Sequence, residues 1–182
     1  MKHWTSFKNV SENKFKSLTI QQCWGFQIQK NTKWNVGLST DEINKMETEF
    51  GFEFPNDYVH MLESINGFNT PHISIDPEGN EPDEFERRCY QYPNDLNKTQ
   101  WLIDEVNQYK NFAIVCLNES SFNTSSIEGF VPLYGHRALV VLQDKTKSPV
   151  LSIWGNDIIV FGKSLLDYWC NELELNIQCI KP

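Results

Sequence analysis

Residues 38–68, LSTDEINKMETEFGFEFPNDYVHMLESINGF, decide the fold, because they specify two short helices joined by a tight link. Ser39 predicts the N-cap of the first helix, and Glu42 completes a capping box, in which each side chain bonds the backbone N–H of the other residue. Gly51 stands where a left-handed C-cap residue ends such a helix. The apolar positions between these caps recur at helical spacing on one face: Ile43, Met46 and Phe50.

The second helix is predicted from Pro55 to Ile65. Proline suits the first turn of a helix, where its missing N–H costs no hydrogen bond. Asn66-Gly67 is typical of a helix end. The apolar side chains again form one stripe: Tyr58, Met61, Leu62 and Ile65. Caps, helix breakers and core faces carry no chemistry, so this stretch predicts a scaffold.

The order of these features resembles the opening of the SUKH superfamily of SMI/KNR-type domains: an acidic capped helix, GFEFPNDY, a second helix and NGF. The second half, GFVPLYGHRALVVL and then SPVLSIWGNDIIVFGKSLLDYW, resembles the strand-rich end of bacterial members. The resemblance covers Gly37 to Leu175, and residues 1–36 match only loosely. It implies the bacterial immunity-protein branch, whose members neutralise toxins. It transfers no catalytic residue, because an active site does not define the family.

The rest of the chain predicts an α+β fold with a largely antiparallel sheet of four or more strands and helices packed at its N- and C-terminal ends. Gly155-Asn156 is a favourable two-residue hairpin connection, and Ser164 with Asp167 predicts the cap of a final helix. The strands expected around that hairpin are Arg137–Leu142, Pro149–Trp154 and Asp157–Phe161. We expect one domain, residues 37–182, with residues 1–36 as an N-terminal extension that packs on it.

Earlier elements are less sharply specified. The alternation of Trp24, Phe26 and Ile28 predicts a strand, and so does His72–Ile75. Pro93–Tyr109 predicts a helix. The run Asn111–Leu117 fits a buried strand or a continuing helix equally well, because periodicity cannot separate the two over so few residues.

The charge of the chain is unevenly distributed. The whole chain carries a net charge of −8. Residues 1–36 contain six lysines and one acid, a net of +5, so residues 37–182 contain ten basic and 23 acidic residues, a net of −13. Such a domain repels nucleic acid, whose binding requires Lys and Arg, and it attracts a basic protein. The plainer alternative is an acidic surface that serves solubility alone.

Composition excludes several other classes. No apolar run is long enough for a membrane helix, and the polar N-terminus lacks the apolar region of a secretory signal. The five cysteines are scattered, without the spacing of a zinc site or a disulfide framework. We therefore expect reduced thiols, a cytoplasmic location, no membrane partner and no cofactor.

His136, Arg137 and Asp157 are the residues that most resemble a catalytic set, since such groups can serve acid–base chemistry. No nucleophile, P-loop or metalloprotease motif accompanies them. A histidine at the start of a strand more often makes a structural hydrogen bond, so we expect no enzyme. The carboxylates near Asp76 lack the order and the closing glutamate of a calcium loop, so we expect no metal site.

Two surface features are candidates for partner binding. Trp154, beside the hairpin turn, is the best candidate for an exposed aromatic anchor, although packing across the hairpin is the more usual role of such a tryptophan. Asp157 lies across that turn. The segment DPEGNEPDEFE, residues 76–86, is expected to be an exposed loop that attracts the partner, with solubility as an equal alternative. Its candidate carboxylates are Asp76, Glu78, Glu81, Asp83 and Glu84.

The sequence thus predicts a non-enzymatic immunity protein that occludes a cognate bacterial toxin. The expected toxin is a basic nuclease, which a carboxylate-rich surface suits. Because the SUKH group also includes a yeast cell-wall-assembly regulator, a regulatory scaffold for several endogenous proteins is the alternative. A hydrolase built on His136, Arg137 and Asp157 is the alternative from the enzyme class.

Overall fold

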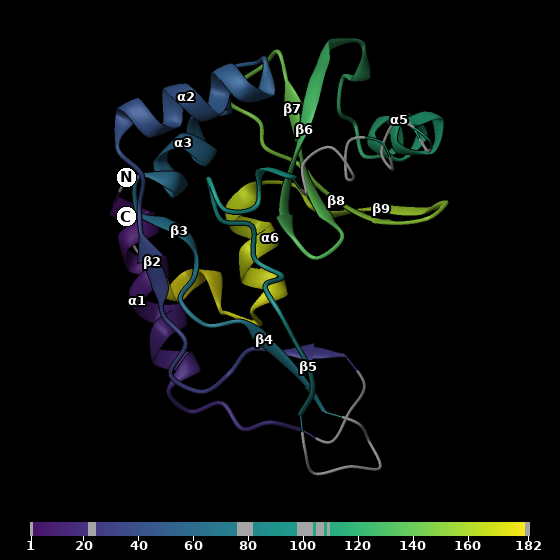
Figure 1. Cartoon of the computed structure of the whole chain (residues 1–182). Coiled ribbons are helices and arrows are strands. Elements are labelled where there is room, and N and C mark those ends of the chain that lie inside the picture. Colours follow the sequence, from purple (N-terminus) through teal and green to yellow (C-terminus); the bar gives the residue numbers. More distant parts are fainter. Residues whose placement is uncertain are drawn as a thin grey trace.

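Figure 1 shows the computed structural model of the chain, which describes residues 2–21, 25–75, 82–97, 104, 108 and 110–180. The fold is α+β, as the sequence predicts. The helices are α1 (Lys2–Phe15), α2 (Thr40–Phe50), α3 (Asn56–Leu62), α5 (Lys110–Glu119) and α6 (Leu165–Glu172). The strands are β1 (Phe26–Gln27), β2 (Trp34–Val36), β3 (Ile65–Phe68), β4 (His72–Ile75), β5 (Pro82–Glu86), β6 (Ile127–Tyr134), β7 (Arg137–Leu142), β8 (Val150–Trp154) and β9 (Asp157–Gly162).

The strands form three antiparallel sheets in the described part of the chain. The largest is a four-stranded meander with the order β6-β7-β8-β9, and the others have the orders β1-β4-β5 and β2-β3. The three strands predicted around Gly155-Asn156 are confirmed as β7, β8 and β9. Trp154 pairs directly with Asp157 across that turn, and Gly155 adopts a φ of +57°, which a residue without a Cβ accepts easily.

The four-stranded sheet is covered on both faces, with α5 on one side and α6 on the other (Figure 1). Alternating side chains of β7 separate the two cores, because neighbouring residues of a strand point to opposite faces. Leu139 and Val141 join the main hydrophobic cluster with α6, α2 and α3. Ala138 and Val140 join a smaller cluster with Ala113 of α5.

The capped helix pair is confirmed at α2. Ser39 accepts from the Glu42 backbone, the Glu42 carboxylate accepts from the Ser39 backbone, and Gly51 is left-handed with a φ of +81°. The end of the second helix is corrected, because α3 stops at Leu62. Asn66 and Gly67 lie within β3, where the buried Asn66 side chain exchanges two hydrogen bonds with the Tyr92 backbone, at 2.7 and 3.0 Å. Tertiary pairing therefore decides the conformation of this dipeptide.

Helix α1 is absent from the sequence predictions and belongs to the main core. Trp4, Phe7 and Phe15 are buried and join the same cluster as Trp34 of β2. The Trp34 indole donates to the buried Ser11 hydroxyl at 2.8 Å. The buried residues of α1 recur at helical spacing, but the polar residues between them made this apolar face hard to recognise in the sequence.

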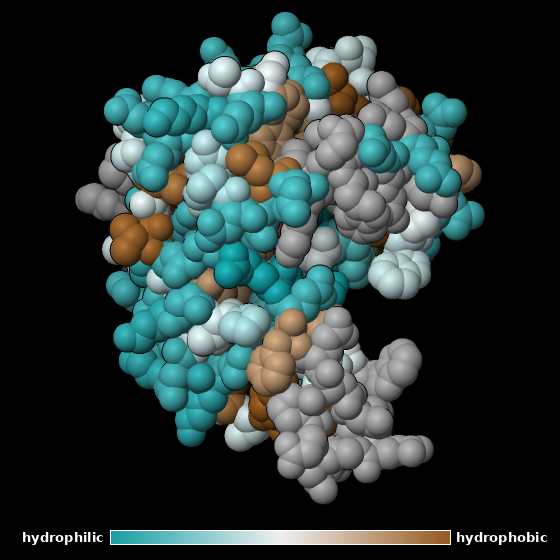
Figure 2. Space-filling view, in the orientation of Figure 1, coloured by the Kyte–Doolittle hydropathy of each residue, from teal (hydrophilic) through white to brown (hydrophobic). Residues whose placement is uncertain are grey.

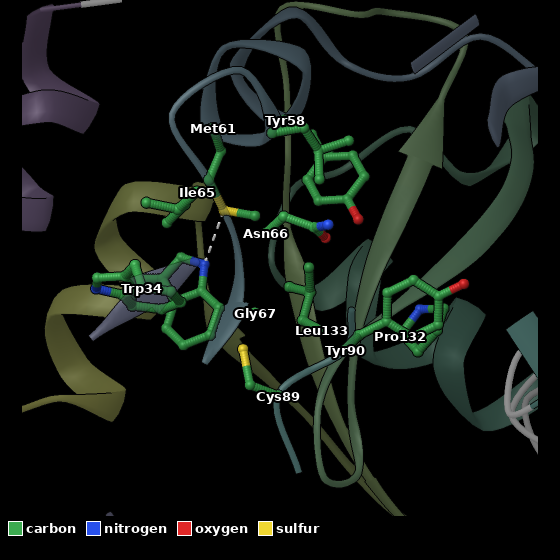
Figure 3. A pocket seen from close by; sticks show the side chains of 12 residues that line it. Trp34, Tyr58, Met61, Ile65, Asn66, Gly67, Cys89, Tyr90, Pro132 and Leu133 are labelled. Carbon is green, nitrogen blue, oxygen red and sulfur yellow. Dashed lines mark hydrogen bonds between the residues drawn. The ribbon is translucent and has the colours of Figure 1, made fainter. Parts of the chain in front are cut away.

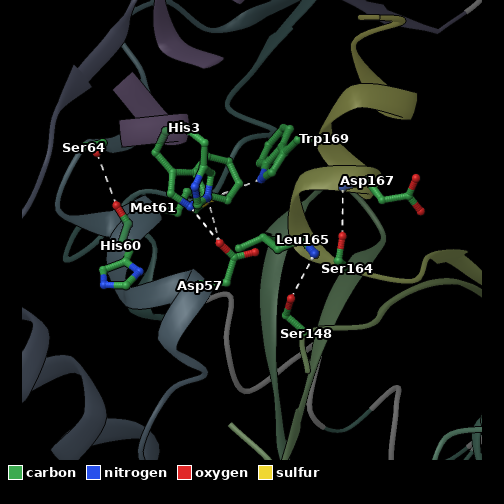
Figure 4. A network of polar contacts seen from close by, with 11 residues as sticks. His3, Asp57, His60, Met61, Ser64, Ser148, Ser164, Leu165, Asp167 and Trp169 are labelled. Atoms are coloured by element: carbon green, nitrogen blue, oxygen red, sulfur yellow. Dashed lines mark hydrogen bonds and ion pairs between the residues drawn. The ribbon is translucent and has the colours of Figure 1, made fainter. Parts of the chain in front are cut away.

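A network of polar contacts fastens α1 to α3 (Figure 4). One carboxylate oxygen of Asp57 accepts from the Trp4 indole at 2.9 Å and lies 3.1 Å from Nε2 of His3. The Trp169 indole of α6 lies 3.1 Å from the Met61 sulfur of α3. Residues distant in the sequence thus hold the N-terminal and C-terminal helices against the capped pair.

Other predictions are settled in part. His72–Ile75 is confirmed as β4, whereas the strand predicted around Phe26 is reduced to β1, and Trp24 lies outside the described residues. The ambiguous run Asn111–Leu117 belongs to the helix α5. Most of the helix predicted over Pro93–Tyr109 also lies outside the described residues.

Candidate functional site

The end of the β8–β9 hairpin presents the most exposed aromatic side chain of the described residues. Trp154 is 70% exposed, and Ile159 of β9 is 50% exposed. Asp157, which pairs with Trp154, is exposed as well. Residues paired across antiparallel strands share one face of the sheet, so Trp154, Asp157 and Ile159 face the same side. We call these three residues, with His136, the hairpin-end surface.

The Trp154 side chain is supported from the neighbouring β6–β7 turn. The His136 ring packs edge-on against the indole, with ring centroids 5.3 Å apart. The His136 carbonyl accepts from the Ile153 backbone at 3.0 Å, which ties this turn to β8. Burial, and then the charge of Arg137, lower the pKa of His136 to about 4. The imidazole is therefore neutral at physiological pH and packs as an aromatic ring.

Arg137, next to His136 in the chain, makes structural contacts with several side chains of the fold. Its guanidinium donates to the Ser152 hydroxyl at 2.7 Å and to the Glu172 carboxylate at 3.1 Å, and it lies 4.2 Å from the centroid of the Phe161 ring. It also contacts the His136 ring. Burial raises the pKa of Glu172, and the charge of Arg137 acts in the opposite direction. The arginine thereby compensates a carboxylate that would otherwise be costly to bury.

The structure does not bring the suspected catalytic residues, His136, Arg137 and Asp157, into one hydrogen-bonded group. Within the described residues, no hydrogen bond joins Asp157 to His136 or Arg137. Asp157 lies at the exposed hairpin turn, whereas Arg137 is bound to Glu172. The arrangement suits a braced contact surface better than proton transfer between these three groups.

The structure describes only residues 82–86 of the acidic segment, and it corrects the prediction that they form a loop. Asp76, Glu78 and Glu81 lie outside the described residues. Asp83 and Glu84 belong to β5, where the sequence predicted a loop. This stretch is extended because β5 pairs with β4, with Ile73 opposite Phe85. Backbone pairing with a distant segment therefore overrides the local turn signals.

The two candidate features lie in different sheets. The hairpin-end surface belongs to the four-stranded sheet, and β5 belongs to the three-stranded sheet. Figure 2 shows the molecular surface hollowed below the β8–β9 hairpin and above the small sheet. Phe85 of β5 is 58% exposed, so an apolar side chain protrudes from the small sheet too. The structure brings Trp154 and Asp157 together and places the described candidates Asp83 and Glu84 on a separate element, β5.

Sequence reasoning missed Glu172, although a signal for it exists. The buried residues of α6 follow helical spacing through Leu165, Tyr168 and Trp169, and position 172 continues that stripe. A glutamate at such a position indicates a buried carboxylate that needs a partner. Arg137 supplies the partner from a strand 35 residues away, which no local pattern could have revealed.

A small cavity inside the main core has no room for a ligand (Figure 3). It measures about 10 Å³ and is lined by core residues such as Trp34, Tyr58 and Met61. This volume is at the lower limit of what a single water molecule needs. We assign it to imperfect packing between β3, α3 and α6.

The described residues contain neither a metal-binding cluster nor a membrane-spanning helix. Within the ranges that the structure describes, no three His, Cys, Asp or Glu side chains are grouped to hold a metal ion. The four described cysteines, Cys89, Cys116, Cys170 and Cys179, are free. Each helix in these ranges is too short or too polar to cross a bilayer.

Comparison with known proteins finds no family model, no curated protein and no solved structure that matches this chain.

Proposed function

We propose that this chain is a non-enzymatic immunity protein of SUKH type that binds a cognate bacterial toxin in the cytoplasm and neutralises it by direct occlusion. The order of the capped helices, the NGF segment and the strand-rich second half supports the family. The partner we propose is a basic protein, in particular a nuclease toxin. The protein acts by covering the toxin and leaves it covalently unchanged.

The exposed and braced Trp154 is the observation that carries the proposal. The indole is 70% exposed although the His136 ring and a two-residue turn hold its position. Burying a large apolar side chain stabilises a protein or a complex by about 1.5–3 kcal/mol. The isolated protein does not gain this free energy at Trp154, so a partner that covers the indole can. A pre-positioned aromatic anchor loses little conformational freedom on binding, and such residues dominate binding energies.

The charge of the main domain supports a basic partner. Residues 37–182 carry a net charge of −13, which accelerates association with a positively charged protein. Asp157 adds a carboxylate beside the anchor. The acidic segment, with its candidate residues Asp83 and Glu84 on β5, adds charge at a second place on the molecule. We assign steering to these carboxylates and the binding energy mainly to Trp154.

The experiment is co-expression with the toxin domain encoded by a neighbouring reading frame, followed by titration of the purified proteins. Inhibition should saturate near one protein per toxin, and the complex should bury about 1,200–2,000 Å². Trp154→Ala combined with Asp157→Lys should weaken the complex by at least about tenfold, because a lost anchor and a reversed charge act together.

The matched control is Phe112→Ala combined with Glu119→Lys on α5. Phe112 is 53% exposed and Glu119 is exposed, so the control makes the same chemical changes away from the hairpin. It should leave the affinity unchanged. Protection at strongly substoichiometric levels would indicate turnover and would favour the enzyme alternative. Equal losses of affinity in the two double variants would show that the hairpin-end surface is not part of the interface.

A further inference from the structure

A second hollow, separate from the hairpin-end surface, lies where two helices end. It measures about 500 Å³, within the range of small-molecule sites. The C-terminal residues of α1, the strand β1 and the C-terminal end of α6 enclose it, and these elements can be followed in Figure 1. We call it the helix-end pocket; its lining includes Lys14, Phe15, Phe26, Tyr134, Glu172 and Glu174.

The walls of the helix-end pocket are apolar and aromatic in one part and polar in the rest. Phe15 is buried in the main core, and Phe26 and Tyr134 add two further aromatic rings. Leu18 and Leu173 extend the apolar wall between the rings. Such walls suit a hydrocarbon or aromatic stem, because burying it releases water from both surfaces. Aromatic faces also attract a cation that approaches them.

The polar end of the pocket already stabilises one cation. Lys14 donates from its ammonium to the Leu173 carbonyl at 2.8 Å, to the Glu174 carbonyl at 3.3 Å and to the Glu174 carboxylate at 3.1 Å. The carbonyls at a helix C-terminus carry partial negative charge, so cations are stable there. These three bonds use all three donors of the ammonium group.

Acceptor capacity remains after these bonds are made. A carboxylate offers about four lone-pair positions. Glu172 accepts from Arg137 in the described hydrogen bonds, which leaves other lone-pair positions of its carboxylate free. The Glu174 side chain is 86% exposed and meets only Lys14 in the described ion pairs. The pocket therefore offers acceptors, and a ligand must supply donors.

We propose that the helix-end pocket binds an organic cation, an ammonium or guanidinium group carried on an apolar stem. The stem lies against Phe26, Tyr134 and Leu18, and the cationic head bonds the carboxylates of Glu172 and Glu174. An anion is disfavoured because it would meet two carboxylates and two helix C-termini, and the lining cation, Lys14, already bonds three acceptors. The inference does not depend on the proposed function. A free amine and a basic side chain of a partner protein carry the same chemistry.

The test is a titration of the full, isotope-labelled chain followed by two-dimensional NMR. The probes are agmatine, as a free cation, and N-acetyl-arginine methylamide, as a basic side chain; N-butylurea is the neutral analogue. At least one cation should shift amide signals of residues lining the pocket saturably and bind at least about tenfold more tightly than N-butylurea, because its hydrogen bonds are charge-assisted. Binding of agmatine alone supports a free ligand, and binding of the capped arginine supports a protein side chain.

Three variants localise the binding. Glu174→Gln should weaken cation binding by about tenfold, because it removes a carboxylate acceptor. Leu18→Trp should block the pocket by filling it. Glu119→Gln on α5 makes the same charge change elsewhere and should leave binding unchanged.

Two results would overturn the inference: no saturable shift with either cation, or binding of N-butylurea as tight as that of the cations. Unaltered cation affinity in Glu174→Gln would refute the assigned position of the cationic head. Glu174 is largely exposed, so this variant remains decisive even where Leu18→Trp fails to fold.

Discussion

Mild acid should destabilise this protein through His72. The side chain is 1% exposed in β4, and neither ring nitrogen has a hydrogen-bond partner among the described residues. The rings of Phe68 and Tyr134 pack against it, with centroids 5.6 and 5.0 Å away. Burial, and then the charge of Arg88, lower the pKa of His72 from 6.5 to about 4.

The sign and size of the effect follow from these values. Between pH 6.5 and pH 4 the unfolded chain binds a proton at His72 and the folded chain does not, so stability falls as the pH falls. A pKa lowered from 6.5 to about 4 removes about 2 kcal/mol between pH 8 and pH 5, and about 3 kcal/mol by pH 4. This is a large share of the roughly 5–15 kcal/mol that stabilises a typical domain.

Other groups also titrate in this range, so a variant must isolate His72. The pKa of His136 is lowered to about 4, which acts in the same direction, whereas the raised pKa of Glu172 acts in the opposite direction. The assay is urea unfolding at several pH values for the wild type and for His72→Leu. The free energy of unfolding of the wild type, minus that of His72→Leu, should fall by about 2 kcal/mol from pH 8 to pH 5.

The matched control is Ile73→Val, in the same strand. Ile73 is buried and cannot titrate, so its loss of packing should cost about 0.5–1.5 kcal/mol at every pH. If the difference in free energy of unfolding between the wild type and His72→Leu stays constant between pH 8 and pH 5, the reasoning is refuted. It would mean that His72 keeps an ordinary affinity for protons in the folded state.

Further outcomes are expected elsewhere in the molecule. Gly51→Val should lower the free energy of unfolding by about 1 kcal/mol or more, because a branched side chain resists the φ of +81°; Gly51→Asn should lose less in the same melt. Asp57→Ala should cost about 1–3 kcal/mol in urea unfolding, because the buried Trp4 indole loses its acceptor. Trp154→Ala should leave the melting temperature nearly unchanged while it weakens toxin binding in calorimetry, since its side chain is 70% exposed. Neutralising the acidic segment should slow association and flatten its salt dependence in stopped-flow measurements, with the dissociation rate as the internal control; the residues to change are Asp76, Glu78, Glu81, Asp83 and Glu84.

The sequence by itself determined the features that depend on neighbouring residues. The capping box of Ser39 and Glu42, the left-handed Gly51 and the Ser164 cap of α6 all appear where they were predicted. The Gly155-Asn156 turn is also local, and it correctly joins two strands. Each feature is decided by hydrogen bonds or backbone torsions within a few residues, so the pattern contains the information. The α+β class followed from these elements.

The candidate site was predictable only in part. The turn placed Trp154 and Asp157 together, and the structure agrees. The exposure of Trp154 was not predicted, because a tryptophan beside a turn more often packs across its hairpin. The support from His136, the Arg137–Glu172 pair and the helix-end pocket join segments far apart in the chain.

Tertiary structure alone decided the features in which distant backbones or side chains compete with local signals. Asn66-Gly67 reads as a helix end but pairs in β3, where Asn66 bonds the Tyr92 backbone. Residues 82–86 read as a loop but pair with β4. Helix α1 reads as polar, yet its few aromatic residues meet Trp34 in the core. In each case hydrogen bonds and burial gained across the fold outweigh short-range preferences, and no local pattern records those gains.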